Sequence, residues 1–250
     1  MKLETHFIDI NCDLGEGIGN EAALMPYISS CNLACGSHAG DVETINRVVA
    51  LAKKHNVGVG AHPSFPDRAN FGRTIMPISF EELGISLRKQ IDKVAKACKQ
   101  HEVDLHHIKT HGALYNLCAG DKSYAEFITD LIEELYPSTP IYAPFNSTMS
   151  RVAEGRIKVI YEAFADRNYE ADGSLMSRVK PEAVITDKNT VFEHVITMIK
   201  DNKIKAFSGE FISARINTIC VHGDTPKAVE ILKLLNEKLN SNAIKIQTVI

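Results

Sequence analysis

The chain has 250 residues, of which 44% are hydrophobic and 24% charged, and its formal net charge is −3. This composition supports a globular core, and the small negative charge gives no electrostatic reason to bind nucleic acid. No stretch approaches the roughly 18 apolar residues of a membrane span, and the first residues lack the apolar core of a signal peptide. We therefore expect a cytoplasmic protein that binds neither nucleic acid nor membrane.

Short apolar runs alternate with longer amphipathic segments along the chain. The runs predicted as strands are residues 7–10, 31–35, 57–60, 105–108, 141–143, 159–161, 183–185 and 219–221. Alternating strands and helices are typical of parallel β/α units. Seven or eight such units without a Pro/Gly/Ser linker favour a single domain over residues 1–250, built as a closed or nearly closed barrel. A doubly wound open sheet would show the same alternation.

Helix boundaries are marked by capping residues. Asp41 is a candidate N-cap for a helix over 42–52, and Ser79 with Glu82 forms a capping box before a helix over 83–98. Further apolar stripes predict helices over 124–135, over 192–199 and, after Thr225-Pro226, over 229–239. Residues 63–77 carry several prolines and no periodic pattern, which predicts a long loop over the mouth of a pocket.

Six polar patches each follow a predicted strand. They are residues 11–16, 35–41, 60–63, 109–115, 162–167 and 221–224. Because loops at the carboxyl ends of parallel strands surround one pocket, the patches together predict an active site assembled from the whole chain. The six cysteines form no C-x-x-C pair, which predicts reduced and mostly buried thiols, three of them beside these patches.

Four histidines lie in different patches: His38, His62, His111 and His222. Neutral imidazole is the commonest metal ligand and suits proton transfer near neutral pH. A divalent ion would take two or three of them with a carboxylate, although no contiguous motif such as H-E-x-x-H is present. Each could instead hold a loop through a hydrogen bond. The histidines predicted to be solvated are His6, His55, His101 and His194.

Asp13 and Glu16 follow the first strand and form a pair of carboxylates. Such a pair can bind a metal, orient a lysine, act as a general base, or cap the next helix. Lys109 ends a strand just before His111, where an ammonium can stabilise an oxyanion or bind a substrate carboxylate.

Glu162 and Arg167 follow the strand predicted over 159–161. Arg167 can form a two-pronged clamp on a carboxylate, or an internal ion pair with Asp166 or Asp172. The sequence has no G-x-x-x-x-G-K-[ST] phosphate loop, no G-x-G-x-x-G fingerprint and no G-x-S-x-G elbow. A conventional nucleotide enzyme or serine hydrolase is therefore disfavoured.

The six patches, taken in order, resemble the LamB/YcsF family over roughly residues 7 to 226. The motifs are N-C-D-L-G-E from Asn11, C-G-S-H-A-G-D from Cys35, G-A-H-P from Gly60, H-G-A-L-Y from His111, F-A-D-R from Phe164 and V-H-G-D from Val221. Ser37, Ser64-Phe65 and Thr110 depart from the family's common pattern without removing an ionisable group.

The resemblance implies a seven-stranded parallel (β/α) barrel of the glycoside hydrolase/deacetylase type. It also implies the A component of a bacterial ATP-dependent 5-oxoprolinase, which works with subunits B and C and converts 5-oxo-L-proline to L-glutamate. ATP, with Mg²⁺, would be a co-substrate. The missing phosphate loop then suggests that nucleotide chemistry depends on the partner subunits.

Motif position gives a hypothesis for each role. Asp13 would be general base or metal-orienting carboxylate, supported by Glu16, and His38, His62 and His111 would activate water or bind a metal. A metal, if present, would be held by Asp13, His38 and His62. The expected substrate-binding residues are Lys109, Glu162, Arg167 and His222. Two alternatives stay open: a free-standing metal-dependent amidohydrolase or deacetylase, and a non-catalytic substrate-binding subunit.

Overall fold

The computed structural model describes residues 6–249, and its centre is a barrel of parallel strands. The seven barrel strands are β1 (His6–Leu14), β2 (Ser30–Ala34), β3 (Gly58–His62), β4 (Leu105–Ile108), β5 (Ile141–Pro144), β6 (Val159–Phe164) and β9 (Thr218–His222). Each pairs with the next in this order, and β1 pairs with β9, with Asp13 opposite His222. The predicted seven-stranded barrel is confirmed, and the open sheet is excluded because β1–β9 pairing closes the ring.

Three further short strands lie outside the ring. β10 (Ile244–Ile246) pairs in parallel with the first residues of β1, so one strand contacts β2, β9 and β10 along different parts of its length. β7 (Lys203–Lys205) and β8 (Phe211–Ser213) form a separate antiparallel ribbon.

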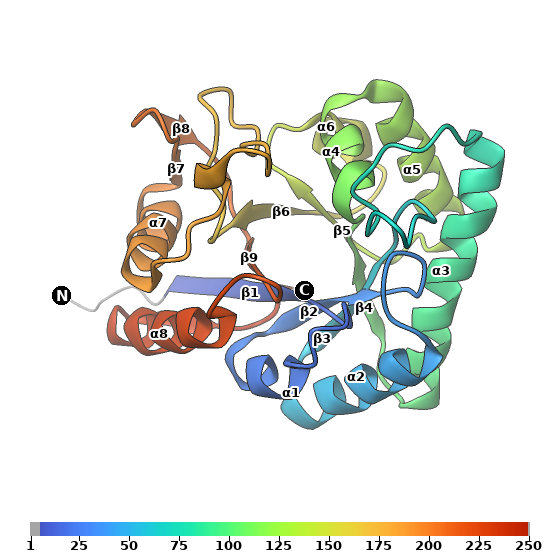
Figure 1. The fold of residues 1–250 in the computed structure, drawn as a ribbon, viewed down its shortest axis with the longest axis horizontal. Coiled ribbons are helices and arrows are strands. Elements are labelled where there is room, and N and C mark those ends of the chain that lie inside the picture. The colour runs from blue at the N-terminus through green and yellow to red at the C-terminus, as the bar shows by residue number, and fades with distance from the viewer. Residues whose placement is uncertain (1–5, 250) are drawn as a thin grey trace.

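Helices surround the strands on the outside (Figure 1). They are α1 (Glu21–Leu24), α2 (Val42–His55), α3 (Phe80–Gln100), α4 (Gly112–Gly120), α5 (Lys122–Leu135), α6 (Thr148–Ala153), α7 (Lys188–Asp201) and α8 (Ala228–Ser241), with 3₁₀ turns η1 (Met25–Tyr27) and η2 (Pro181–Ala183). None of the helices within residues 6–249 has the length and hydrophobicity that a membrane crossing needs.

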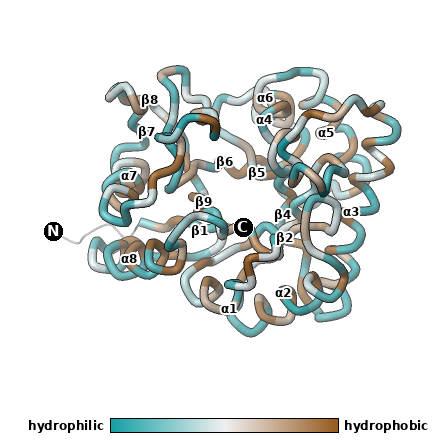
Figure 2. Tube along the Cα trace, in the orientation of Figure 1, coloured by the Kyte–Doolittle hydropathy of each residue, from teal (hydrophilic) through white to brown (hydrophobic). Residues whose placement is uncertain are grey.

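The long helices are amphipathic, and their ends follow the predicted caps. Hydrophobic and hydrophilic residues alternate with the helical turn along α8 and α3 (Figure 2). Asp41 accepts a hydrogen bond from the Thr44 amide at 2.8 Å, and Ser79 with Glu82 forms the reciprocal capping box of α3. The apolar faces of these helices pack on the barrel, which places the loops at the strand ends.

Three predictions about elements are corrected. Residues 183–185 are not a strand: Pro181 opens the 3₁₀ turn η2, and Val184 makes only an isolated bridge with Arg167. Helix α8 begins at Ala228, because the Thr225 hydroxyl bonds Asp166 instead of capping the helix. His194 is buried, since it lies on the inner face of α7.

The barrel interior is lined by polar side chains instead of the branched apolar layers usual in β/α barrels. On β1, Asp9, Asn11 and Asp13 alternate with apolar residues and are all buried. Since side chains alternate in direction along a strand, these three residues face the same side, the barrel axis. Asp9 accepts hydrogen bonds from hydroxyls that include Ser30 at 2.8 Å and Tyr142 at 3.0 Å.

A second polar layer lies between Asp9 and the pocket. Asn32 donates to Asn11 at 2.7 Å, and its side-chain oxygen lies 2.6 Å from Nε2 of His107. Gly60 faces the His107 imidazole so closely that a Cβ there would overlap the ring. The pocket above therefore rests on a floor of satisfied hydrogen bonds.

Candidate active site

A cavity of about 920 Å³ opens at the carboxyl ends of the barrel strands. Of the nine predicted site residues, eight line it: Asp13, Glu16, His62, Lys109, His111, Glu162, Arg167 and His222. His38 lies behind the lining, with its ring stacked on that of His111 at a centroid distance of 3.9 Å. The topology thus gathers side chains from five strand ends and their loops at one place, as the patches predicted.

The floor of the cavity carries a buried ammonium between two carboxylates. Lys109 Nζ lies 3.1 Å from Asp13 Oδ1, 2.9 Å from Glu162 Oε1 and 3.3 Å from Cys220 Sγ. An ammonium has three N–H donors, so each of them has a partner here. Binding a substrate carboxylate at Lys109, as the sequence suggested, would require one of these partners to be exchanged.

Charge pairing sets the ionisation of this floor. Burial alone would raise the pKa of Asp13, but the positive charge of Lys109 outweighs it and holds that pKa well below its usual value. Burial likewise would lower the pKa of Lys109, but Asp13, then Cys220 and Glu162, raise it well above normal. Both groups are therefore charged at neutral pH.

Glu162 is also fully engaged. Its Oε1 accepts from the Asn11 amide at 3.0 Å as well as from Lys109, and its Oε2 accepts from the Tyr115 hydroxyl at 2.8 Å. This carboxylate therefore orients Lys109 and Tyr115, and its predicted contact with substrate stays a prediction.

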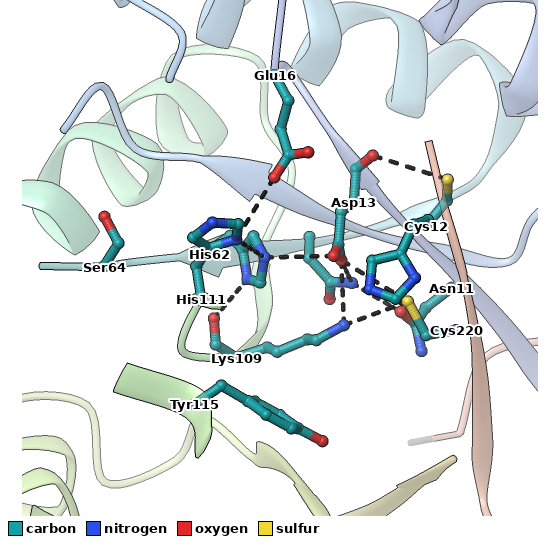
Figure 3. A network of polar contacts seen from close by, with 12 residues as sticks. Asn11, Cys12, Asp13, Glu16, His62, Ser64, Lys109, His111, Tyr115 and Cys220 are labelled. Carbon is teal, nitrogen blue, oxygen red and sulfur yellow. Dashed lines mark hydrogen bonds and ion pairs between the residues drawn. The ribbon is translucent and has the colours of Figure 1, made fainter. Parts of the chain in front are cut away.

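A second cluster joins Glu16 to three imidazoles on one side of the cavity. Figure 3 shows the Glu16 carboxylate pointing at His62 and His111. Glu16 Oε1 lies 3.5 Å from both His38 Nε2 and His111 Nδ1, and His62 Nε2 lies 3.0 Å from His111 Nδ1. Asp13 Oδ2 touches the edge of the cluster, 3.5 Å from His62 Nε2.

The imidazole cluster is shielded from water. Burial, followed by the neighbouring charge of His62, lowers the pKa of His38 to about 3 and that of His111 well below its usual value. Burial and then the Asp13 charge raise the pKa of Glu16 well above normal. The two histidines are therefore neutral imidazoles.

The loop predicted over 63–77 covers this cluster. Phe71 packs its ring against those of His38 and His111, each at a centroid distance of 5.4 Å. The Arg73 guanidinium lies over the Phe71 ring, pairs with Asp224 at 2.8 Å and lines the cavity. No helix or strand forms between β3 and α3, so the predicted loop is confirmed.

The opposite wall holds a carboxylate–histidine pair. Asp166 Oδ1 lies 2.9 Å from His222 Nδ1, while Asp166 Oδ2 accepts from the His222 backbone amide at 3.0 Å and from the Thr225 hydroxyl. Burial would raise the pKa of Asp166, but His222 outweighs it and lowers that pKa. Because Nδ1 is held by Asp166, the other ring nitrogen is left for the cavity that His222 lines.

Arg167 forms neither of the ion pairs considered from the sequence. Its guanidinium instead donates to the carbonyls of Ala183 at 3.1 Å and Met176 at 2.6 Å. Burial, then the charge of Arg178, lowers the pKa of Arg167 to about 10. Within residues 6–249 neither arginine has a salt bridge, so this wall carries two uncompensated positive charges.

Sequence reasoning missed several residues of the site. Arg178 lies in a segment without strand or helix signal, and Tyr115 was quoted only as part of a motif. Asn11 and Asn32 could have been found, because each alternates with apolar residues along its strand and so shares the inward face of its neighbours. All six cysteines are buried and free, as predicted.

Comparison with known proteins places these features in context. The LamB/YcsF family profile matches residues 8–250. The 5-oxoprolinase A component of Pyrococcus abyssi is 41% identical over 245 residues, which are 96% of this chain and 96% of that protein. The same protein of Clostridium beijerinckii is 42% identical with the same coverage.

A solved structure gives the same result for the fold. The lactam utilization protein from Thermus thermophilus is 33% identical and superposes with a TM-score of 0.91, covering 97% of this chain and 99% of that one. The similarity therefore extends over the whole barrel and is not confined to the motifs.

Proposed function

This chain belongs to the LamB/YcsF family, and from that premise we propose that it is the A component of an ATP-dependent 5-oxoprolinase. Relatives about 40% identical over nearly their whole length carry that name, and this is the observation that supports the proposal most strongly. The reaction would open the lactam of 5-oxo-L-proline to L-glutamate, with ATP converted to ADP and phosphate. We also place the enzyme in the cytoplasm.

The chemistry explains why ATP is needed. A lactam is a resonance-stabilised amide, and its ring opening is too unfavourable to proceed without coupling. Transfer of the γ-phosphoryl group to the lactam oxygen would release ADP and leave a better electrophile at carbon. Water would then add to that carbon, the C–N bond would break with protonation of nitrogen, and phosphate would leave.

We place proton transfer in this sequence on His222. Its ring is oriented by Asp166 and lines the cavity, which is the arrangement of a general acid or base with its orienting carboxylate. Asp13, the base suggested by motif position, has a lowered pKa and accepts hydrogen bonds from Asn32 at 2.6 Å and Lys109. It is better suited to hold Lys109 at the floor, where the ammonium would stabilise negative charge on the substrate.

The arginine wall would bind the anion. Arg167 and Arg178 line the cavity without a carboxylate partner, so a substrate carboxylate or a transferring phosphoryl group would neutralise them. The cavity, about 920 Å³, is larger than one five-membered ring needs and leaves space for a phosphorylated intermediate.

Subunits B and C would supply the nucleotide site, because the sequence has no phosphate loop. Exposed apolar residues next to the cavity support a contact with other chains: Val179 is 92% exposed and lines the mouth, and Phe211 on β8 is 58% exposed. Apolar side chains gathered beside a functional opening are typical of an interaction surface.

The test is glutamate release from 5-oxo-L-proline by this chain with its candidate B and C subunits, with ATP present or omitted. We expect glutamate only when ATP and all three chains are present. If an assembled complex released no glutamate, or if this chain alone turned over 5-oxoproline without ATP, the proposal would fail.

A further inference from the structure

The imidazole cluster presents nitrogen lone pairs, because the opposite nitrogen of each ring is already used as a donor. Nδ1 of His62 lies 2.7 Å from the backbone carbonyl oxygen of Lys109. A carbonyl oxygen can only accept, so Nδ1 carries the proton. In the neutral ring, Nε2 of His62 is then a bare lone pair directed into the cluster.

His111 is held in the same way by the covering loop. Its Nε2 lies 2.9 Å from the carbonyl oxygen of Phe71, so Nε2 carries the proton and Nδ1 is the acceptor. Nδ1 of His111 and Nε2 of His62 are 3.0 Å apart. Two lone pairs at this separation repel each other unless a cation lies between or beside them.

His38 adds a third lone pair. The Ser64 hydroxyl donates its only proton to the carbonyl of Phe65 at 2.8 Å, so it must accept from Nδ1 of His38 at 2.9 Å. Nε2 of His38 is then the acceptor, and it faces Glu16 Oε1 at 3.5 Å. Both of these atoms are buried without a hydrogen-bond partner in the described part of the chain, which is costly for polar atoms.

From this geometry we infer that Glu16, His62 and His111 bind a first-row divalent transition-metal ion such as Zn²⁺, with His38 and Asp13 at its edge. Their donor atoms all lie within 4.8 Å of one another. Ligands held about 2.0–2.1 Å from a tetrahedral ion are roughly 3.3 Å apart, close to the 3.0 and 3.5 Å separations found here. The backbone carbonyls at His62 and His111 are the outer partners that metal-binding imidazoles usually have.

A second group of possible ligands is excluded by charge. Asp13, Cys220 and His222 also place donor atoms within 4.8 Å of one another. Lys109 Nζ, however, already lies against Asp13 Oδ1 and Cys220 Sγ, and its positive charge would repel a dication. The site is therefore assigned to the Glu16 cluster.

The ion would meet the cavity, because Glu16, His62 and His111 all line it. A divalent ion in such a place supplies Lewis-acid polarisation of a carbonyl oxygen or lowers the pKa of a bound water. Binding of the ion does not depend on the identity of the substrate, so the metal site and the 5-oxoprolinase reaction can fail separately.

The experiment titrates the chelator-stripped chain with Zn²⁺ by calorimetry and with Co²⁺ by visible absorption. We expect one ion per chain, with Glu16→Gln and His111→Gln each weakening binding at least tenfold. Cys220→Ala is the matched control from the excluded group and should bind as the wild type does. Circular dichroism of each variant shows whether it is folded.

The cobalt spectrum decides the matter even if a ligand variant does not fold. Nitrogen and oxygen ligands give d–d bands without a thiolate-to-cobalt charge-transfer band, whereas a site at Cys220 would show that band. The inference is overturned if the stripped wild type binds neither ion at micromolar concentration, or if the charge-transfer band appears.

Discussion

Asp166 and His222 are joined twice: the carboxylate lies 2.9 Å from the ring Nδ1 and also accepts from the backbone amide of the same histidine at 3.0 Å. This double contact fixes both the position of β9's last residue and the direction in which its imidazole points. An oriented imidazole exchanges protons with a bound ligand at one nitrogen only.

Asp166→Asn tests this orientation. The amide NH₂ can donate to Nδ1, which would place the ring proton on the nitrogen facing the cavity and remove the acceptor there. We expect kcat for glutamate formation to fall at least tenfold, about 1.4 kcal/mol in barrier, with KM little changed. Steady-state kinetics of the assembled enzyme provides the measurement.

The control for that change is Asp130→Asn, which alters a surface partner of Arg156 and should leave kcat unaltered. An unchanged kcat in folded Asp166→Asn would remove the Asp166–His222 pair from the mechanism.

Lys109→Met tests the floor of the cavity. The variant leaves Asp13 and Glu162 buried without their shared counter-ion, and breaking a buried pair in this way typically costs about 3–5 kcal/mol. Urea denaturation measures the free energy of unfolding. The matched control is Lys53→Met, whose exposed pair with Glu102 should contribute less than about 1 kcal/mol. Equal losses in the two variants would contradict our account of the floor.

Arg178→Gln tests the arginine wall. The side chain is exposed at the cavity and has no salt bridge within residues 6–249, so the variant should fold normally. We expect KM for 5-oxoproline or for ATP to rise roughly tenfold, about 1.4 kcal/mol, with a small change in kcat. Arg156→Gln, on the outer surface, is the control. Wild-type KM values for both substrates would show that no anion binds at this wall.

Gly60→Ala tests the packing of the barrel interior. A methyl group at this position would overlap the His107 ring, which is itself bonded to Asn32, so neither can move freely. Overpacking of this kind costs about 1–3 kcal/mol or more. Gly84→Ala is the matched control, because its methyl would meet only Phe127 at an ordinary 3.5 Å and would favour helix α3. The variants should therefore shift the melting temperature in opposite directions.

His194→Leu tests a buried histidine far from the reacting groups. Burial lowers the pKa of His194 from 6.5 to about 4. Between these values the unfolded chain binds a proton that the folded chain does not, so stability is lost as pH falls from about 6.5 to about 4. The loss is about 1.4 kcal/mol per pH unit. Free energies of unfolding at pH 7 and pH 5 should differ less in the variant, and an equal difference would refute the assignment.

The seven barrel strands could be predicted because each is a short apolar run bounded by turn residues. The caps at Asp41 and Ser79 could be predicted because they depend only on neighbours three residues away. The strand predicted over 183–185 was wrong because an apolar run beside a proline also suits a covering segment. His194 could have been placed correctly, since Val191, Val195 and Met198 share its helical stripe and are buried.

The site could be predicted as a set of residues but not as a set of pairs. Loops at the same end of a barrel must converge, so the patches identified the lining of the cavity. Which atoms meet depends on strand register: Lys109 reaches Asp13 across 96 residues of sequence, and local pattern contains no information about that contact. The Ser64 contact with His38 was hidden for the same reason.

The three partners of β1 have a consequence for biosynthesis. Thr218 on β9 bonds Asp9 across 209 residues of sequence, and β10 lies later still. While the ribosome is making the middle of the chain, β1 therefore has only β2 beside it, and its polar interior residues are not yet enclosed. Closure at such sequence separation is slow. We expect nascent chains that end before β9 to remain protease-sensitive and to need chaperone protection.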